Sequence, residues 1–312
     1  MATTLFWLQA GGCGGDSMAL LNLQNPHICE WLRLIDVEPL WHPSLSNRSP
    51  REQEILLDRV LSGEQPLDIF CVEGAVVRGP GGTGMFDTHR RRPKKDLIGR
   101  LAAQARHVIA VGTCASYGGL GANGDIEATG LQFHKSSMGG FLGAEFRSGS
   151  GSPVINLPGC PCHPEVVAHL LSALSCGMEL PLNEFQAPLQ WYGMLVHQGC
   201  IRNEYHEYRV EETDFGKRGC LFFHLGCQGP LTHGPCNKLR WNGRSSKTSV
   251  GVPCLGCTDP EFPKPYPFFQ TRNIAGIPMD LPEGVDRAHY LAYKGMAAAA
   301  APARLRERQT RV

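Results

Sequence analysis

The sequence predicts an α/β protein, in which a parallel β-sheet with helices on both faces is followed by an irregular, cysteine-rich region. Two patterns carry this prediction. Through the first half of the chain, short apolar segments of strand length alternate with helical segments, the pattern of a parallel sheet. After about Trp191 the apolar periodicity fades and Gly, Pro and Cys become dense. Such a region cannot build a large core of its own, so we expect bound metal groups to hold it folded.

The predicted elements alternate along the chain. The expected strands are residues 5–10, 68–74, 107–114 and 153–160, and the expected helices are residues 17–23, 51–63, 94–105 and 164–177. Length and strand count suit a flavodoxin-like arrangement, although the pattern does not fix the strand order. We place a domain boundary near residue 185, which gives domains 1–185 and 186–312. The Ala-rich, finally basic tail 297–312 is expected to be a frayed helix or a solvated terminus.

Composition narrows the class of protein. A formal net charge of +1 argues against nucleic acid as the main partner, because phosphate binding normally requires a strong basic excess. No apolar run approaches the roughly 20 residues of a membrane span. The N-terminal MATTLFWLQAGG resembles no export signal, so we expect a cytoplasmic protein. Thirteen cysteines in such a chain indicate metal or cluster ligation and not a disulfide scaffold.

Three of the expected strands end in a cysteine beside glycine: Cys13 in AGGCGGD, Cys114 in VGTCASYGG and Cys160 in LPGCPCHP. In an open parallel sheet, ligands bind beyond the carboxyl ends of the strands. Glycines at these positions let the backbone approach a bulky inorganic group closely. One such cysteine alone is more often a buried core residue. Three at successive strand ends favour thiolates that share one iron–sulfur cluster.

A four-iron cluster needs a fourth ligand. Asp16 lies three residues after Cys13, the spacing of a Cys-x-x-Cys pair, but it is also a suitable N-cap for the helix expected at 17–23. Cys162 is a competing candidate, although it lies only two residues after Cys160. The residue pattern leaves these alternatives open.

The second half of the chain holds a further set of closely spaced candidate ligands. A zinc site is one interpretation, because Cys-x-x-Cys pairs such as PCLGC are common in zinc sites. Seven ligands divide more naturally into four and three, which suits a four-iron and a three-iron cluster. The set consists of His197, Cys200, Cys220, Cys227, Cys236, Cys254 and Cys257.

Taken together, these motifs resemble the small subunits of nickel–iron hydrogenases. WLQAGGCGGD, VGTCASYGG, NLPGCPCHP, LGCQGPLTHGPCN and GVPCLGCTDPEFP occur in the order of that family and cover roughly residues 5–265. The resemblance implies a flavodoxin-like domain, two [4Fe-4S] clusters and one [3Fe-4S] cluster. It also implies an obligate heterodimer with a large subunit that carries the NiFe centre, with a dimer of heterodimers as an open option.

The resemblance assigns ligands by position. Cys29, Cys71, Cys162 and Cys176 are left over and are expected to be core thiols. The proximal [4Fe-4S] cluster would take Cys13, Asp16, Cys114 and Cys160; the distal [4Fe-4S] cluster would take His197, Cys200, Cys220 and Cys227; and the medial [3Fe-4S] cluster would take Cys236, Cys254 and Cys257.

The chain departs from the usual family pattern in two places. Asp16 stands where most relatives have the second cysteine of a Cys-x-x-Cys pair, which is similar to the actinobacterial-type, oxygen-insensitive branch. The spacing from Cys220 to Cys227 is one residue longer than expected, so Cys220 is the least secure of the distal ligands.

The activity implied is that of an uptake hydrogenase. Hydrogen would be oxidised to protons and electrons on the partner, and electrons would pass through the proximal, medial and distal clusters to an unidentified acceptor near His197. An H2-sensing regulatory hydrogenase is the nearest alternative, but its relatives normally keep Cys at position 16. A zinc-stapled interaction module and a respiratory-complex-like subunit are further alternatives, although the latter has a tandem Cys-Cys that this chain lacks. Glu73 is expected to cap a loop more readily than to relay protons.

Overall fold

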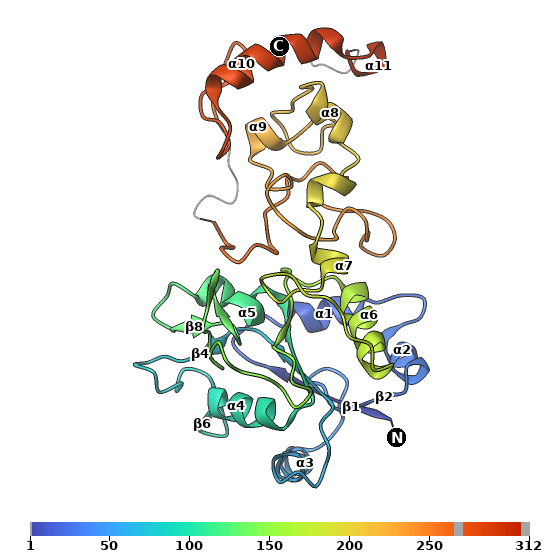
Figure 1. Cartoon of the computed structure of the whole chain (residues 1–312), viewed down its shortest axis with the longest axis vertical. Helices are drawn as coiled ribbons and strands as arrows, with labels where there is room; N and C mark the ends of the chain where they lie inside the picture. Colours follow the sequence, from blue (N-terminus) through green and yellow to red (C-terminus); the bar gives the residue numbers. More distant parts are fainter. Residues whose placement is uncertain (1, 265–270, 307–312) are drawn as a thin grey trace. The chain divides into compact units, whose positions relative to one another are not determined.

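The computed structural model describes residues 2–264 and 271–306, and the chain divides into two compact units (Figure 1). The first unit comprises Met1–Gly193 and Cys257–Phe262, and the second comprises Met194–Gly256 and Pro263–Val312. The boundary expected near residue 185 lies a few residues before this division. The structure also assigns Cys257–Phe262 to the first unit, whereas the sequence-based division placed these residues in the second domain.

The first unit is built on a five-stranded parallel sheet, which confirms the predicted α/β class. Its strand order is β11-β7-β3-β1-β2, the order of doubly wound flavodoxin-like sheets. The strand that sequence reasoning missed, β2, contains Pro39 and lies at the sheet edge, where a missing N–H is tolerated. The strands are β1 (Thr3–Gln9), β2 (Val37–Trp41), β3 (Ile69–Glu73), β7 (His107–Val111) and β11 (Ile155–Leu157).

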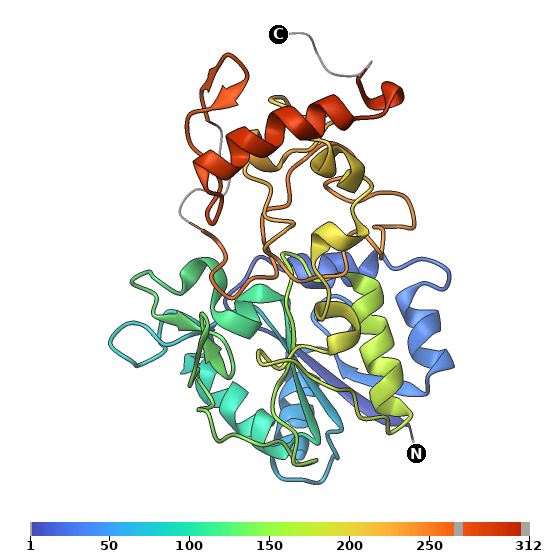
Figure 2. The same ribbon diagram turned by 45° about the horizontal axis from the view of Figure 1, so that its top comes forward.

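Helices cover both faces of this sheet (Figures 1 and 2). The buried side chains of α3 and α4, such as Leu57 and Leu101, join Phe6, Phe70 and Val108 of the strands in one apolar core. A capping box and a proline at the first helical position start α3. The helices are α1 (Gly15–Leu21), α2 (Ile28–Leu34), α3 (Pro50–Leu61), α4 (Lys94–Gln104), α5 (Gly112–Tyr117), α6 (Pro164–Ser175) and α7 (Leu189–Tyr192).

Short elements decorate the loops of the first unit. The 3-10 turn η1 (Gly119–Gly121) follows α5. Three antiparallel pairs complete the unit: β4 (Val76–Val77) with β8 (Ala128–Thr129), β5 (Thr88–His89) with β6 (Arg92–Pro93), and β9 (Phe133–His134) with β10 (Ser137–Met138).

The second unit has little regular structure, as the sequence indicates. Its small apolar cluster combines Phe222, Phe223 and Tyr290 with three of the candidate cysteine ligands, Cys220, Cys227 and Cys254. Its elements are η2 (Val196–Gly199), α8 (Asn203–Glu207), α9 (Phe222–Leu225), β12 (Asn273–Ile274), β13 (Ile277–Pro278), α10 (Arg287–Ala300) and α11 (Ala303–Arg306).

The Ala-rich tail differs from its expectation as a frayed or solvated terminus. Residues 297–300 are the last turn of α10, and Ala297, Ala301 and Leu305 are buried. Residues 307–312, the end of the tail, lie outside the described residues. Among the helices that the structure describes, none combines the length and apolar character that crossing a bilayer requires.

Candidate functional site

The three cysteines expected at the proximal site lie beyond the carboxyl ends of three strands of the sheet, of which β7 and β11 are neighbours and β1 is separated from β7 by β3. Cys13 follows β1, Cys114 lies in the first turn of α5 directly after β7, and Cys160 follows β11. The pKa of Cys160 is raised to about 11, first by burial and then by the charges of Cys257, Cys114, Asp16 and Cys13. The electrostatic coupling means that these groups share one region at the edge of the sheet. In the chain by itself, Cys13 and Cys160 are exposed and Cys114 is half-buried.

Asp16 belongs to the same group, but not as the N-cap of α1. That helix begins after Gly14, which has a left-handed conformation and no capping side chain, and Asp16 lies in the first turn. Its Oδ1 instead accepts a hydrogen bond of 2.6 Å from the backbone N–H of Cys162. Burial raises the pKa of Asp16 to about 7, the hydrogen bond from Cys162 opposes this rise, and the charge of Glu73 adds to it. A carboxyl placed in this way is well suited to face a cation.

Glu73, at the end of β3, fixes the loop that carries Cys13 and Asp16. One carboxylate oxygen accepts the backbone N–H groups of Asp16 and Ser17 at 3.0 Å each, and the other accepts the Trp7 indole N–H at 3.0 Å and the Ser17 hydroxyl. The side chain is buried, with 1% of the residue exposed. The expectation that Glu73 has a capping role agrees with these contacts, because a carboxylate at a helix N-terminus satisfies free N–H groups and favours the helix dipole.

Two glycines make room for this group of side chains. A Cβ on Gly119 would lie 2.5 Å from the Cys114 sulfur, and a Cβ on Gly112 would lie 2.2 Å from Asp16 Oδ2. Both glycines have positive φ, of 54° and 83°, which other residues rarely adopt. Soft thiolates beside tight, glycine-lined backbone are the donor set and the cradle that a [4Fe-4S] cluster requires. The residues present therefore fit such a cluster.

Cys257, expected as a medial ligand, lies in the first unit beside the proximal group. The Thr113 hydroxyl donates a hydrogen bond to the Cys257 carbonyl oxygen, and it accepts one of 2.9 Å from the backbone N–H of Gly159. Thr113 thus ties the segment of Cys257 to the residue that precedes Cys160. Sequence reasoning missed Thr113, because nothing in the local pattern reveals a partner 144 residues away.

The four expected distal ligands all belong to the second unit. His197 lies in η2 and Cys200 directly follows it, while Cys220 and Cys227 flank α9. Burial, and after it the charges of Cys227 and Cys200, raise the pKa of Cys220 to about 12. Cys220, the least secure ligand from spacing, is therefore coupled electrostatically to two of the others.

His206 is a second histidine beside this distal group and was not foreseen. Its ring centroid lies 4.8 Å from that of His197, and its Nδ1 lies 3.4 Å from the Cys220 sulfur. Burial lowers the pKa of His206 to about 4, and the charges of His197 and Arg209 lower it further. The ring is therefore neutral at pH 7 and forms an uncharged wall against the distal group.

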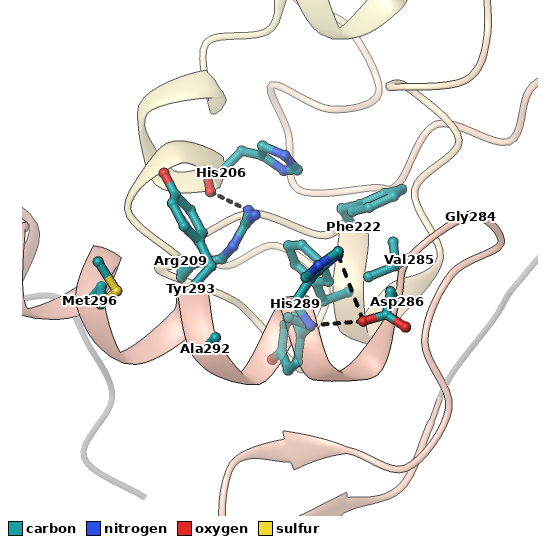
Figure 3. A pocket seen from close by; sticks show the side chains of 12 residues that line it. His206, Arg209, Phe222, Gly284, Val285, Asp286, His289, Ala292, Tyr293 and Met296 are labelled. Carbon is teal, nitrogen blue, oxygen red and sulfur yellow. Dashed lines mark hydrogen bonds and ion pairs between the residues drawn. The ribbon is translucent and has the colours of Figure 1, made fainter.

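A pocket of about 640 Å³ opens on the other side of His206 (Figure 3). The Arg209 guanidinium lies 4.6 Å from the Phe223 ring centroid and 4.8 Å from that of Tyr293, so cation–π contacts hold it in the pocket wall. The full lining is His206, Arg209, Phe222, Phe223, Gly284, Val285, Asp286, His289, Tyr290, Ala292, Tyr293 and Met296.

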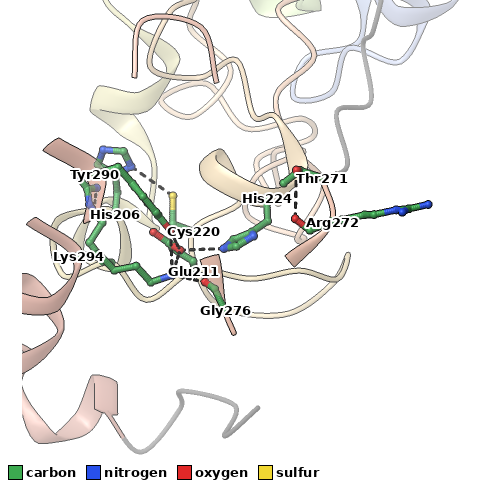
Figure 4. Close-up of polar contacts among 10 residues, drawn as sticks. His206, Glu211, Cys220, His224, Thr271, Arg272, Gly276, Tyr290 and Lys294 are labelled. Carbon is green, nitrogen blue, oxygen red and sulfur yellow. Dashed lines mark hydrogen bonds and ion pairs between the residues drawn. The ribbon is translucent and has the colours of Figure 1, made fainter. Parts of the chain in front are cut away.

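A buried carboxylate connects α10 to the loop of Cys220 (Figure 4). Glu211 Oε2 lies 2.9 Å from His224 Nε2 and accepts hydrogen bonds from the Tyr290 hydroxyl at 2.7 Å and from Lys294 Nζ at 2.9 Å. Burial raises the pKa of Glu211, but these three partners outweigh it and the pKa lies below its ordinary value. The backbone of Glu211 pairs with that of Cys220, so the network supports one of the expected ligands.

The two remaining medial candidates lie in the second unit. The backbone N–H of Cys254 points to the Cys227 sulfur at 3.2 Å, and Cys236 is half-buried. Ser246 lies in the same unit, and its hydroxyl donates a hydrogen bond of 2.6 Å to Asn237 Oδ1. Among the described residues, no group of three or more His, Cys, Asp and Glu side chains is arranged to hold a single metal ion.

The four cysteines that are not assigned as cluster ligands differ in their exposure to solvent. Cys71 and Cys162 are buried, as expected of core thiols. Cys29 and Cys176 are exposed, so the prediction that they are core thiols is wrong. Cys29 lies on the outer side of α2, and Cys176 is the C-cap of α6, where the chain turns away from the core.

Comparisons with known proteins agree with this arrangement. Residues 192–270 match the model of the C-terminal part of NiFe/NiFeSe hydrogenase small subunits, and residues 13–174 match the model of the 20 kDa subunit of NADH ubiquinone oxidoreductase. The F420 non-reducing hydrogenase I small subunit of Methanosarcina mazei is 33% identical over 309 residues, which cover 89% of this chain and 79% of that protein. The periplasmic [NiFeSe] hydrogenase small subunit of Desulfomicrobium baculatum is 31% identical, covering 83% of this chain and 84% of that protein.

Solved structures show the same likeness. The actinobacterial-type NiFe-hydrogenase from Ralstonia eutropha H16 superimposes with a TM-score of 0.77 at 26% identity, covering 97% of this chain and 86% of that chain. The NiFeSe hydrogenase from Desulfomicrobium baculatum gives a TM-score of 0.74 at 26% identity, covering 86% of this chain and 100% of that chain. Fold, identity and coverage agree, and this chain therefore belongs to the small subunits of [NiFe] hydrogenases, the electron-transfer partners of a large subunit that carries the active site.

Proposed function

We propose that this chain is the electron-transfer subunit of a [NiFe] uptake hydrogenase with three iron–sulfur clusters. The clusters, when bound, supply one-electron carriers, and hydrogen is oxidised on the partner subunit. Residues of this chain hold them as follows: Cys13, Asp16, Cys114 and Cys160 a proximal [4Fe-4S] cluster, Cys236, Cys254 and Cys257 a medial [3Fe-4S] cluster, and His197, Cys200, Cys220 and Cys227 a distal [4Fe-4S] cluster.

The observation that carries this proposal is the proximal group itself. Three thiols and a carboxyl with a pKa near 7 act on one another at the edge of the sheet. Cys13 and Cys160 are exposed in the chain by itself. We propose that the large subunit covers this edge, which would exclude water from the thiolates and shorten the path from its NiFe centre.

The exit for electrons is proposed to lie near His197. The neutral His206 ring stands between the distal group and the pocket of Figure 3, so an acceptor seated there would contact a ring that touches His197. Because the pKa of His206 is about 4, its ring is uncharged at pH 7, and the contact does not require a charged group to lose its water. The identity of the acceptor is left to experiment.

Asp16 supports assignment to the oxygen-insensitive, actinobacterial-type branch. The likeness to the actinobacterial-type NiFe-hydrogenase from Ralstonia eutropha H16 points the same way. A cytoplasmic location and a heterodimer, single or paired, are part of the same proposal. Cell fractionation and the mass of the purified complex test these two points.

The decisive experiment is hydrogen-dependent dye reduction by the heterodimer, with and without air. Rapid turnover that persists in air is the expected result. Negligible turnover in a complex that contains nickel, iron and labile sulfide would replace the uptake enzyme by an H2 sensor. A matched pair, Asp16→Cys and Asp16→Ala, tests the fourth ligand. An unchanged proximal EPR signal in both variants would remove Asp16 from the ligand set.

A further inference from the structure

Lys135 is a buried lysine that has no ion-pair partner among the described residues. It lies in the turn between β9 and β10 with a φ of 52°, and the residue is 8% exposed. Its Nζ donates hydrogen bonds to the carbonyl oxygens of Gly119 at 3.2 Å and Phe262 at 3.0 Å. Buried lysines are rare and normally pair with a carboxylate, so an ammonium held by two carbonyl groups needs an explanation.

The two carbonyl groups belong to segments that carry expected cluster ligands. Gly119 packs so closely on Cys114 that its added Cβ would lie 2.5 Å from the sulfur. Phe262 ends the segment that begins at Cys257 and returns to the first unit. Lys135 therefore joins the loop after a proximal ligand to the segment that supplies a medial one.

The charge of Lys135 also acts on the proximal group. Its Nζ reaches the carbonyl oxygen of Gly119 at 3.2 Å, and Gly119 packs directly on the Cys114 sulfur, so the ammonium lies beside the loop of a proximal ligand. The carboxylates of Glu261 and Asp259 also act electrostatically on Lys135. Glu261 is held by the backbone N–H of Ser136 at 3.1 Å and by the Ser136 hydroxyl. Lys135 thus holds a positive charge at the loop that follows Cys114 and at the end of the Cys257–Phe262 segment.

We infer that Lys135 is a positioning and charge-tuning residue of the proximal cluster. Its donations hold the loop of Cys114 and the segment of Cys257 together, and its charge favours the reduced form of the cluster. The physical reason is electrostatic: one-electron reduction adds negative charge, and a cation in a poorly solvated site stabilises it. This inference rests on the proposed function, which places that cluster at Cys13, Cys114 and Cys160.

Redox titration of the cluster-loaded heterodimer, monitored by the EPR signal of the proximal cluster, tests the inference. Lys135→Gln keeps a hydrogen-bond donor and removes the charge. It should lower the equilibrium constant for one-electron reduction of the proximal cluster about tenfold, which corresponds to a fall in reduction potential of about 59 mV. Lys135→Arg keeps the charge and should retain the wild-type value. Iron content per heterodimer reports separately on the positioning role.

Two further variants make the result independent of folding at Lys135. Glu261→Gln removes an exposed carboxylate and should shift the proximal potential in the opposite, positive direction, by less than Lys135→Gln because solvent screens it. Lys94→Met removes the same charge from a lysine that already pairs with Asp87 at 2.5 Å, and it should leave the potential unchanged.

The possible outcomes distinguish charge tuning by Lys135 from a purely structural role. Opposite shifts in Lys135→Gln and Glu261→Gln support charge tuning. Unchanged potentials in both, with full iron content, overturn it. The proximal cluster could instead be lost in Lys135→Gln while the potential stays unchanged in Glu261→Gln. That result would mean that Lys135 only holds the two segments together, and it would overturn the tuning role. A wild-type heterodimer without any proximal signal would contradict the proposed function itself, and the inference with it.

Discussion

Replacing Glu73 by glutamine perturbs the anchor of the proximal loop with almost no change in shape. The carboxylate accepts four hydrogen bonds, two from the backbone N–H groups of Asp16 and Ser17 and two from the side chains of Trp7 and Ser17. Glutamine has one acceptor oxygen, so its NH2 group must face one of the two donor pairs. Backbone and indole N–H groups cannot reverse their roles, and at least one buried donor is left unsatisfied.

The expected cost follows from the lost contacts. Hydrogen bonds to a charged group contribute about 1.5–3 kcal/mol each, and a carboxylate at a helix N-terminus adds about 0.3–1 kcal/mol. A loss of about 3 kcal/mol is therefore expected. For a domain of this size that corresponds to a fall in Tm of about 6–12 °C. The loop of Cys13 should loosen together with α1.

Thermal unfolding of the heterodimer and the iron content of its proximal site are the assays. Glu73→Gln should lower both the Tm and the occupancy of the proximal cluster. Glu64→Gln is a matched control, because this exposed glutamate pairs only with Arg59 at the surface. A Glu73→Gln heterodimer with wild-type Tm and a full proximal EPR signal would refute the anchoring role.

Three further predictions concern other parts of the chain. Cys114→Ala should abolish the proximal EPR signal, whereas Asp16→Cys should retain a proximal cluster with an altered spectrum; identical spectra in wild type and Asp16→Cys would count against ligation by Asp16. Glu211→Ala should destabilise the second unit by about 3–5 kcal/mol, because it removes the anion that faces buried His224 and half-buried Lys294, and it should broaden the distal EPR signal. Burial lowers the pKa of His42 to about 4, so its contribution to stability is complete above about pH 6.5 and is lost as the pH falls toward 4. His42→Phe should flatten the dependence of Tm on pH in that range. An unchanged dependence would contradict the conclusion that His42 causes it.

The parallel sheet was predictable because its strands are continuous apolar runs separated by helical segments. All four expected strands exist. Three of them are central, and the fourth, β11, is an edge strand whose three residues are all buried, so each is an apolar run. The other edge strand, β2, was missed because its short segment VEPLW is interrupted by the exposed residues Glu38 and Pro39. Edge strands face solvent and need neither full apolarity nor every backbone hydrogen bond.

The candidate ligands could also be predicted from the sequence, since cysteines after strands and at short spacings reflect chemistry that is local in the chain. The exposure of the remaining cysteines was harder to predict. Cys71 lies within the apolar run of β3 and is buried, whereas Cys29 lies in α2 and Cys176 is the C-cap of α6, and both are exposed. Burial depends on which face of a helix meets the core, and one sequence alone does not fix the docking of short helices such as α2.

By itself, the sequence determined the fold class through its periodicity and indicated the family through the resemblance of its motifs to known small subunits, while the ligand roles of its thiols stay a prediction. Only the tertiary structure decided what surrounds them: Glu73 beneath the Cys13 loop, His206 beside His197, and Lys135 between Gly119 and Phe262. These partners lie far from the ligands in sequence or carry no motif. Their roles arise from burial, which turns ordinary side chains into fixed charges and obligatory hydrogen-bond partners where water is excluded.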